Sequence, residues 1–189
     1  MARQSEIVLA RHGRPQPQEA TRISGDGLAA WVRRYNEAGI TRDLPPPEYL
    51  RHLAAASGRV VASDLPRSIE SAKWLVDDVH IEPDLREAGL PHAIQVPMCM
   101  SPSTCIGIAR VLWFLNWGNS METVADARAR ALRATDRLCM LAQEHQSVLV
   151  VGHGMFNRFI ATCLRSRGWS GPQILPRAYW SSARFVQNL

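Results

Sequence analysis

The chain has 189 residues, of which 46% are hydrophobic and 21% are charged, a balance that excludes a disordered or fibrous protein. This length suits one domain with a substantial buried core. The formal net charge of +5 at pH 7 favours anionic partners, phosphate esters among them, although a solvated arginine-rich face would produce the same charge. No recognised nucleic-acid-binding motif accompanies the basic charge, so we expect no nucleic-acid partner.

The sequence indicates a cytoplasmic protein. Its first residues lead into a hydrophobic strand and show no secretory signal pattern. The longest apolar stretch, residues 106–117, is interrupted by Arg110 and is too short to cross a bilayer, so we expect no membrane partner. The four cysteines lack the Cys-x-x-Cys spacing typical of zinc sites and are expected to be reduced.

Hydrophobic patterning predicts strands that alternate with helices along the chain. Apolar runs typical of buried strands occupy residues 7–10, 60–62 and 148–151, with shorter candidates at 80–82 and 183–186. Helical spacing predicts helices over residues 28–38, 47–56, 66–76, 106–117, 121–144 and 155–164, whereas 87–103 is expected to be loop. This alternation is typical of the α/β class: a three-layer sandwich with a mostly parallel central sheet flanked by helices on both faces.

Three of the predicted strands end in cationic or imidazole side chains. Arg11 and His12 follow the first strand, Arg67 lies shortly after the second, and His153 follows the fourth. Ligands collect at the carboxyl ends of strands in open α/β sheets, so these side chains are expected to share one crevice. Two guanidinium groups can bind phosphoryl oxygens, and a neutral imidazole can attack phosphorus. The glycines beside both histidines would let the backbone approach a ligand closely.

The order of these segments resembles the histidine phosphatase superfamily, which includes phosphoglycerate mutases and many small phosphatases. The resemblance covers most of the chain, and it implies one histidine phosphatase domain over residues 1–189. It rests on five segments, which are LARHG at 9–13, SDLPRSIESA at 63–72, LRE at 85–87, GNSME at 118–122 and VVGHG at 150–154.

The resemblance implies a role for each segment. His12 would attack the phosphorus atom, while Arg11, Arg67 and His153 would hold and neutralise the phosphoryl group. Glu87 would protonate the leaving oxygen and then activate the water that hydrolyses phosphohistidine. No metal or other cofactor is expected, because the arginines supply the positive charge.

Arg14 and Pro15 depart from the commonest family pattern, in which Glu or Gln and then Thr or Ser follow the glycine. A loop Asn often helps to bind phosphate in the family, and Gln18 is the nearest position by spacing. Ser24, in a stretch that partly resembles a family loop, is a second candidate phosphate ligand. Either residue could instead face solvent or serve a turn. Specificity is therefore expected to reside in loops 14–27 and 88–105.

Other acidic residues near Glu87 and Arg67 also have alternative interpretations. Glu82 and Asp84 compete with Glu87 for the acidic role, although spacing favours Glu87. Asp64 is expected to be a hydrogen-bonding or capping residue at a strand-to-helix turn rather than a catalyst.

The aromatic residues also have two interpretations. The tryptophans lie mostly at helical positions that favour core packing. Trp113, Phe114 and Trp117 could alternatively wall a substrate pocket.

The sequence therefore predicts a metal-independent phosphatase that hydrolyses phosphomonoesters through a phosphohistidine on His12. The alternatives are a mutase of the phosphoglycerate type and a non-catalytic phosphate-binding scaffold protein. A mutase must shield its phosphohistidine from water, usually with longer lid segments than 189 residues leave room for. The substrate is expected to be a phosphorylated small molecule or a phosphoprotein. The oligomeric state is open, with a dimer as one option.

Overall fold

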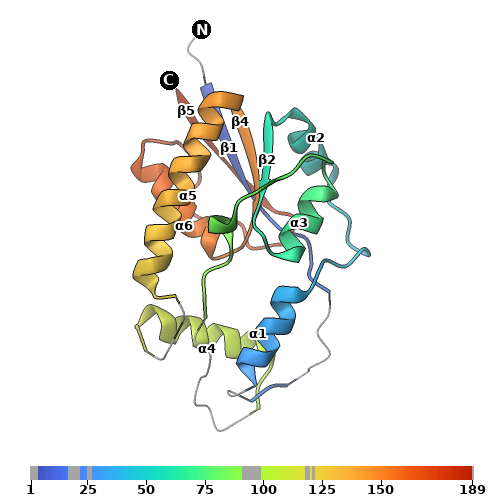
Figure 1. The fold of residues 1–189 in the computed structure, drawn as a ribbon, viewed down its shortest axis with the longest axis vertical. Coiled ribbons are helices and arrows are strands. Elements are labelled where there is room, and N and C mark those ends of the chain that lie inside the picture. The colour runs from blue at the N-terminus through green and yellow to red at the C-terminus, as the bar shows by residue number, and fades with distance from the viewer. Residues whose placement is uncertain are drawn as a thin grey trace.

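The computed structural model describes residues 4–16, 22–24, 27–90, 99–117, 120 and 122–188. Within these ranges strands and helices alternate as the hydrophobic pattern predicts (Figure 1). The elements are β1 (Gln4–Arg11), α1 (Leu28–Glu37), α2 (Glu48–Ala56), β2 (Arg59–Ala62), α3 (Pro66–Lys73), β3 (His80–Ile81), the 3-10 turn η1 (Pro83–Leu85), α4 (Pro102–Phe114), α5 (Val124–His145), β4 (Ser147–Gly152), α6 (Phe156–Ser166) and β5 (Ser182–Asn188).

The sheet has five strands in the order β3-β2-β4-β1-β5. Its pairs are parallel from β3 through β1, and only the β1–β5 pair is antiparallel. The prediction of a mostly parallel sheet is therefore confirmed. Because β1, β2 and β4 run in one direction, their carboxyl ends meet at the same edge of the sheet, the edge that faces α1 and α4 in Figure 1.

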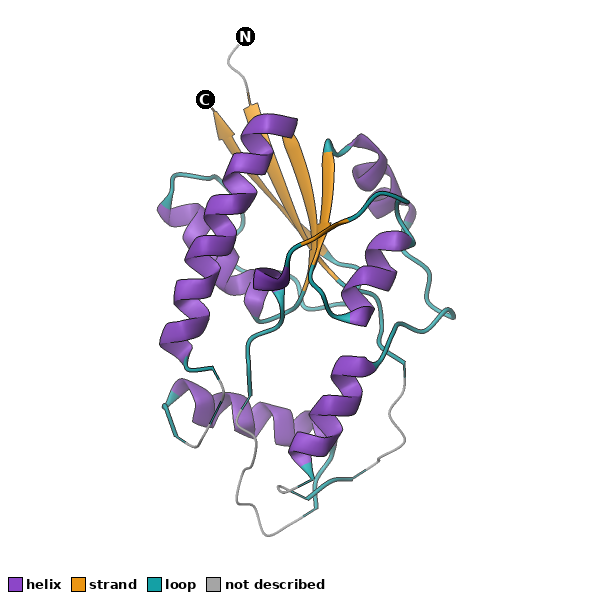
Figure 2. Cartoon of the chain, viewed as in Figure 1, coloured by secondary structure: helices purple, strands orange, loops and turns teal. Residues whose placement is uncertain are grey.

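Helices cover both faces of the sheet, so the predicted three-layer arrangement is also confirmed (Figure 2). Alternate residues of each strand point to opposite faces. In β4, Val148 and Val150 join the cluster that α5 and α6 bury, whereas Leu149 and Val151 join the cluster that α2 and α3 bury. The central strand is thus apolar on both faces, as expected for a strand covered by helices on both sides.

Helices α1 and α4 form a separate unit beyond the carboxyl edge of the sheet (Figure 2). Their buried side chains make a third hydrophobic cluster, distinct from the two that flank the sheet. This cluster consists of Ile23, Leu28, Trp31, Cys105 and Ala109. A bridge between Ile23 and Met100 ties the segment before α1 to the segment before α4.

Two helices begin where side chains cap them rather than where the apolar spacing begins. Helix α4 starts at Pro102, ahead of the predicted residue 106, because the Ser101 side chain accepts a hydrogen bond from the Thr104 amide. Helix α5 starts at Val124 and not at residue 121, because Thr123 and Asp126 form a reciprocal capping box. Helix α3 ends at Lys73, earlier than the predicted residue 76.

The aromatic residues at the end of α4 do not share one environment. Trp113 is buried and donates its indole N–H to the Glu122 carbonyl at 2.7 Å. Phe114 and Trp117 are exposed, with 71% of the Trp117 surface accessible, so the prediction that these residues pack in the core is wrong for two of the three. None of the three lines the large pocket described below. No helix in the described part of the chain is long and apolar enough to cross a membrane.

Candidate active site

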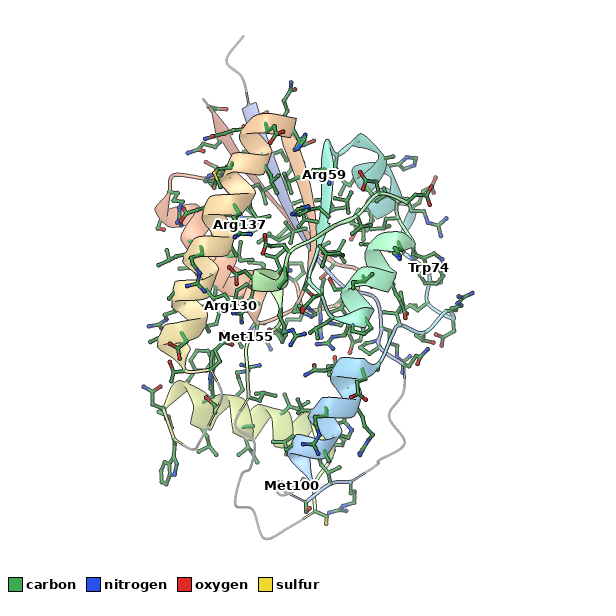
Figure 3. The ribbon with its side chains drawn as sticks, viewed as in Figure 1. Arg59, Trp74, Met100, Arg130, Arg137 and Met155 are labelled. Carbon is green, nitrogen blue, oxygen red and sulfur yellow. The ribbon has the colours of Figure 1, made fainter. Side chains whose placement is uncertain are left out.

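A pocket of about 1010 Å³ lies between the carboxyl edge of the sheet and the α1–α4 unit. The sheet side contributes Arg11 and Arg67, and the opposite side contributes residues of α1 and α4 such as Val32 and Ile106. Arg130, labelled in Figure 3, reaches the pocket from α5. Of the three strand-end segments singled out in the sequence, the first and second line this cavity through Arg11 and Arg67. His12 and His153 are almost fully buried and are not among the lining residues.

His12 is held at the end of β1 in a single neutral form. Its ring is buried, with 2% of its surface exposed, and its Nδ1 lies 2.7 Å from the Gly13 carbonyl. A carbonyl only accepts, so Nδ1 carries the proton and Nε2 keeps its lone pair. Burial, reinforced by the nearby Arg67 guanidinium, lowers the pKa of His12 to about 3. At neutral pH the imidazole is therefore uncharged.

The glycines beside the two histidines accommodate protein side chains rather than a ligand. A Cβ on Gly13 would lie 2.4 Å from the Trp180 ring, and one on Gly152 would lie 2.4 Å from Oδ1 of Asn157. Trp180 itself has a positive φ of 62°, an uncommon conformation for a non-glycine residue. The expectation that these glycines admit a close ligand is wrong at Gly13 and Gly152, where the space is filled by packing.

Arg67, in the first turn of α3, is the most buried cation at the site, with 1% of its surface exposed. Its Nη1 donates to the Tyr35 carbonyl at 3.1 Å and to Oδ1 of Asn36 at 3.3 Å. The guanidinium also lies over the Tyr35 ring, 4.5 Å from its centroid. Burial lowers the pKa of Arg67, but an arginine stays charged at neutral pH. Its Nε is buried without a hydrogen-bond partner.

His153 lies beside His12, with the two ring centroids 5.1 Å apart. Its Nε2 lies 2.6 Å from the Ser63 hydroxyl, whereas its Nδ1 is buried without a partner. Burial, with the neighbouring His12 next in effect, holds the pKa of His153 well below its ordinary value, so this ring is also neutral at pH 7. If the Ser63 hydroxyl donates to Nε2, Nδ1 carries the free proton and becomes a hydrogen-bond donor.

Arg11 reaches the site from the last residue of β1. Its Nη1 donates to the Arg177 carbonyl, and its guanidinium lies 4.4 Å from the centroid of the Tyr179 ring. The Tyr179 ring in turn lies 5.8 Å from the ring of His12. These contacts leave the Arg11 Nε buried and without a partner.

Among the residues that the structure describes, three buried side-chain nitrogens of the groups around His12 have no hydrogen-bond partner. They belong to Arg11, Arg67 and His153. Both arginines are close enough to lower the pKa of His12 through their charge. Buried N–H groups without partners are uncommon, because each forfeits its hydrogen bond to water. An oxyanion such as a phosphoryl group would satisfy all three.

Glu87 faces the same pocket from the loop after η1. Its carboxylate accepts hydrogen bonds from the amides of Met155 at 3.2 Å and Phe156 at 2.9 Å. These are unpaired N–H groups in the first turn of α6, which also favours a negative charge through the helix dipole. Because α6 begins three residues after His153, this contact ties Glu87 to the segment that follows the second histidine.

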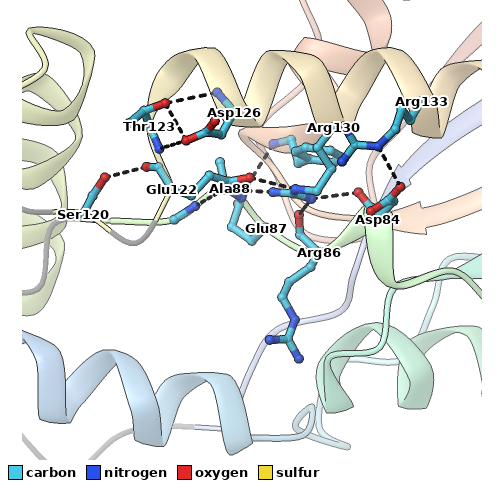
Figure 4. A network of polar contacts seen from close by, with 12 residues as sticks. Asp84, Arg86, Glu87, Ala88, Ser120, Glu122, Thr123, Asp126, Arg130 and Arg133 are labelled. Atoms are coloured by element: carbon cyan, nitrogen blue, oxygen red, sulfur yellow. Dashed lines mark hydrogen bonds and ion pairs between the residues drawn. The ribbon is translucent and has the colours of Figure 1, made fainter.

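The Glu87 loop is itself fixed from α4 and α5. Arg130 forms two hydrogen bonds to Glu122, at 2.7 and 3.0 Å, and Glu122 accepts the Gly89 amide at 2.8 Å (Figure 4). Arg110 donates to the Gly89 carbonyl at 2.9 Å. The acid-bearing loop is therefore held by a paired network on the far side from His12.

The competing carboxylates point elsewhere. Glu82 is buried and accepts from Arg137 at 2.8 Å, and neither it nor Asp84 lines the pocket. Asp64 forms a two-pronged pair with Arg86, at 2.9 and 2.8 Å. Helix α3 has no side-chain cap, so the capping role considered for Asp64 is wrong, whereas its hydrogen-bonding role is present.

Of the two loop candidates for phosphate binding, Ser24 is described and does not line the pocket. Ser24 is exposed and accepts a hydrogen bond from the Gly27 amide at 3.1 Å. Its observed contact is that of a turn residue. Gln18 lies outside the described residues.

Sequence reasoning missed the residues that orient the charged groups. Ser63 holds His153, Tyr35 and Asn36 hold Arg67, and Tyr179 stacks on Arg11. Ser63 stands at the end of β2 in a quoted motif, so its position carried a signal. The other three occupy segments without a recognisable motif and depend on tertiary contacts.

Three solved structures illustrate the similarity of the fold. A mycobacterial glucosyl-3-phosphoglycerate phosphatase is 20% identical, with a TM-score of 0.54 and coverage of 86% of this chain and 80% of that one. The α-ribazole phosphatase of Shigella flexneri is 20% identical, with a TM-score of 0.56 and coverage of 84% and 79%. The phosphoserine phosphatase of Entamoeba histolytica is 14% identical, with a TM-score of 0.55 and coverage of 85% and 80%. At these identities the likeness shows the fold alone.

A comparison with curated proteins finds no significant match. The family model described as "Histidine phosphatase superfamily (branch 1)" matches residues 7–185, which is nearly the whole chain. The match confirms the sequence-based assignment to a phosphatase family whose members work through phosphohistidine. The chain belongs to the histidine phosphatase superfamily, branch 1.

Proposed function

We propose that the chain hydrolyses phosphomonoesters without a metal, with His12 as the nucleophile. The observation that supports this most directly is the set of unpartnered buried nitrogens of Arg11, Arg67 and His153 around a neutral, correctly tautomerised His12. Positioning and charge stabilisation account for most of the catalysis in phosphoryl transfer, and this arrangement supplies both.

The proposed reaction has two steps. Nε2 of His12 attacks phosphorus, the N–P bond forms, and the P–O bond to the alcohol breaks while Glu87 protonates the departing oxygen. Water then attacks the phosphohistidine, Glu87 takes a proton from it, and the N–P bond electrons return to Nε2. Arg11, Arg67 and His153 would donate to the phosphoryl oxygens throughout.

We also propose that residues 1–189 form a single phosphatase domain. The family model extends over residues 7–185, and the described elements build one sheet with β4 at its centre and β5 on its edge. A concave pocket of about 1010 Å³ is the kind of site that binds a phosphorylated small molecule, which we propose as the substrate.

The test is phosphate release from phenyl phosphate in the presence and absence of EDTA. Equal rates are expected in both, and His12→Ala is expected to abolish turnover while its circular dichroism spectrum is kept. Rapid quenching of the native protein should trap acid-labile phosphate on His12. Turnover by His12→Ala, or loss of activity with EDTA, would contradict the proposal. Formation of 2-phosphoglycerate from 3-phosphoglycerate, without phosphate release, would favour a mutase instead.

A further inference from the structure

The pocket holds more positive charge than one phosphoryl group needs. Among the described residues, its lining includes seven arginines and two carboxylates, those of Glu87 and Glu122. The arginines are Arg11, Arg14, Arg33, Arg67, Arg86, Arg110 and Arg130. A large excess of one charge in a concave site favours a ligand of the opposite charge.

Besides Arg11 and Arg67, three of these arginines already contact carboxylates or backbone carbonyls. Arg86 is paired with Asp64, and Arg130 is paired with Glu122. Arg110 donates to two backbone carbonyls of the Glu87 loop. Since Arg11 and Arg67 are assigned to the reacting phosphoryl group, Arg14 and Arg33 are the pocket arginines without an assigned partner.

Arg14 and Arg33 are both exposed, and neither side chain has a hydrogen bond or ion pair to any residue that the structure describes. Their backbones, however, are anchored close to the phosphate-binding residues. Arg14 lies two residues after His12, and its carbonyl accepts the Thr41 amide at 2.8 Å. Arg33 precedes Asn36 by three residues on α1, which places the two on one helix face about 5–6 Å apart at Cβ.

Asn36 accepts a hydrogen bond from Arg67, so Arg33 lies about one helical turn from a residue that contacts this guanidinium. The pocket between them is lined by apolar side chains of both walls, including Val32, Leu65 and Ile106. At about 1010 Å³ it lies at the upper end of ligand-sized cavities, far larger than a phosphate group.

Resting on the proposed function, we propose that the substrate is a phosphomonoester with an apolar body and a second anionic group. The phosphoryl group binds at Arg11, Arg67 and His153, the body lies along the apolar lining, and Arg14 and Arg33 hold the second anion. That anion is a carboxylate or a second phosphate, since arginine binds either in bidentate fashion.

The test measures binding of non-hydrolysable phosphonates by calorimetry, because binding does not require turnover. Benzylphosphonate is the parent ligand, compared with its 3- and 4-carboxy derivatives and with the 1,3- and 1,4-xylylene bisphosphonates. At least one derivative is expected to bind about tenfold more tightly than the parent, the size of one charge-assisted hydrogen bond. The preferred series distinguishes a carboxylate from a phosphate as the second group.

The double variant Arg14→Gln/Arg33→Gln is expected to lose this advantage. Arg34→Gln is the matched control, since Arg34 is the neighbour of Arg33 on α1, is also exposed and does not line the pocket. The control should keep the full advantage. Thermal melting checks that both variants fold.

The outcomes separate the two proposals. If benzylphosphonate binds and no derivative gains affinity, or if the gain survives in the double variant, the second-anion site is wrong and the phosphatase proposal stands. An equal gain for every isomer would indicate general charge attraction and would also overturn the site. If benzylphosphonate and all its derivatives fail to bind, both proposals are wrong.

Discussion

The two walls of the pocket are built in different ways. One wall, which includes Arg67, is set at the ends of buried parallel strands, and His12, His153 and Arg67 are almost fully buried there. The opposite wall is made by α1 and α4, whose hydrophobic cluster is separate from the main core. The large core restrains the groups that we propose to bind phosphate, whereas a small cluster holds the groups that we propose to contact the rest of the substrate.

The difference shows where the chemistry and the specificity reside. A nucleophile must be held within a fraction of an ångström, and strand ends locked by a shared hydrogen-bond ladder provide that precision. Elements with few buried apolar contacts open more readily, and substrate-contacting regions are commonly drawn from them. The four predictions below test this division, beginning with the largest expected effect.

Glu87→Gln tests the proposed proton donor on the wall at the strand ends. With phenyl phosphate, kcat is expected to fall by about 10²–10⁴-fold, because glutamine cannot transfer the proton. With 4-nitrophenyl phosphate the loss should be much smaller, since that leaving group needs no proton. Steady-state kinetics on both substrates measure the difference. Glu144→Gln, an exposed carboxylate on α5, is the control. An equal loss on both substrates would mean that Glu87 only caps α6.

Arg67→Met tests the buried cation while keeping much of the apolar side-chain bulk. We expect kcat/KM for phenyl phosphate to fall by about 10²–10³-fold, the usual loss when one charge-stabilising donor is removed. Arg59→Met provides the comparison, because Arg59 lies on β2, forms an ion pair with Asp78 and does not line the pocket. A loss below about fivefold for Arg67→Met would place it among weak surface charges rather than catalytic ones.

Leu28→Ala tests whether the α1–α4 wall can open by itself. Leu28 is fully buried in that wall's cluster, so its truncation should cost about 2–5 kcal/mol locally. Hydrogen exchange is expected to accelerate in α1 and α4 and to stay unchanged in β1 and β4. Leu149→Ala, in the core of the sheet, should instead accelerate exchange throughout. Faster exchange across the whole sheet in Leu28→Ala would show that the two walls unfold as one.

Stability against acid tests the cost of burying His12. Its pKa is about 3 in the folded chain and 6.5 when unperturbed, so the unfolded state takes up the proton first as pH falls. The contribution of neutral His12 to the free energy of unfolding is therefore fully present above pH 6.5 and is lost as the pH falls from 6.5 to 3. Over this range, protonation of His12 changes the free energy of unfolding by about 1.4 kcal/mol per pH unit.

Urea unfolding between pH 4 and 6 measures that slope. In His12→Asn it should decrease by the same amount, about 1.4 kcal/mol per pH unit. His52→Asn serves as the control, since His52 is exposed on α2. An unchanged slope in His12→Asn would contradict the burial argument.

Much of this site could be predicted before the structure was known. The apolar runs of β1, β2 and β4 predicted buried parallel strands, and parallel strands place their ends together. Arg11, Arg67, Glu87 and His153 follow from that rule and from the family resemblance. Helix boundaries were less predictable, because Ser101 and Thr123 cap α4 and α5 through side-chain hydrogen bonds that apolar spacing does not reveal.

By itself, the sequence determined the α/β class, the alternation of strands and helices, and which strand ends carry cationic and imidazole groups. These depend on local periodicity and on the topology of parallel strands. Only the tertiary structure decided the tautomer of His12, the Ser63 contact of His153 and the positions of Arg14 and Arg33 in the pocket. The reason is physical: these features depend on contacts between segments far apart in the chain, which no local pattern encodes.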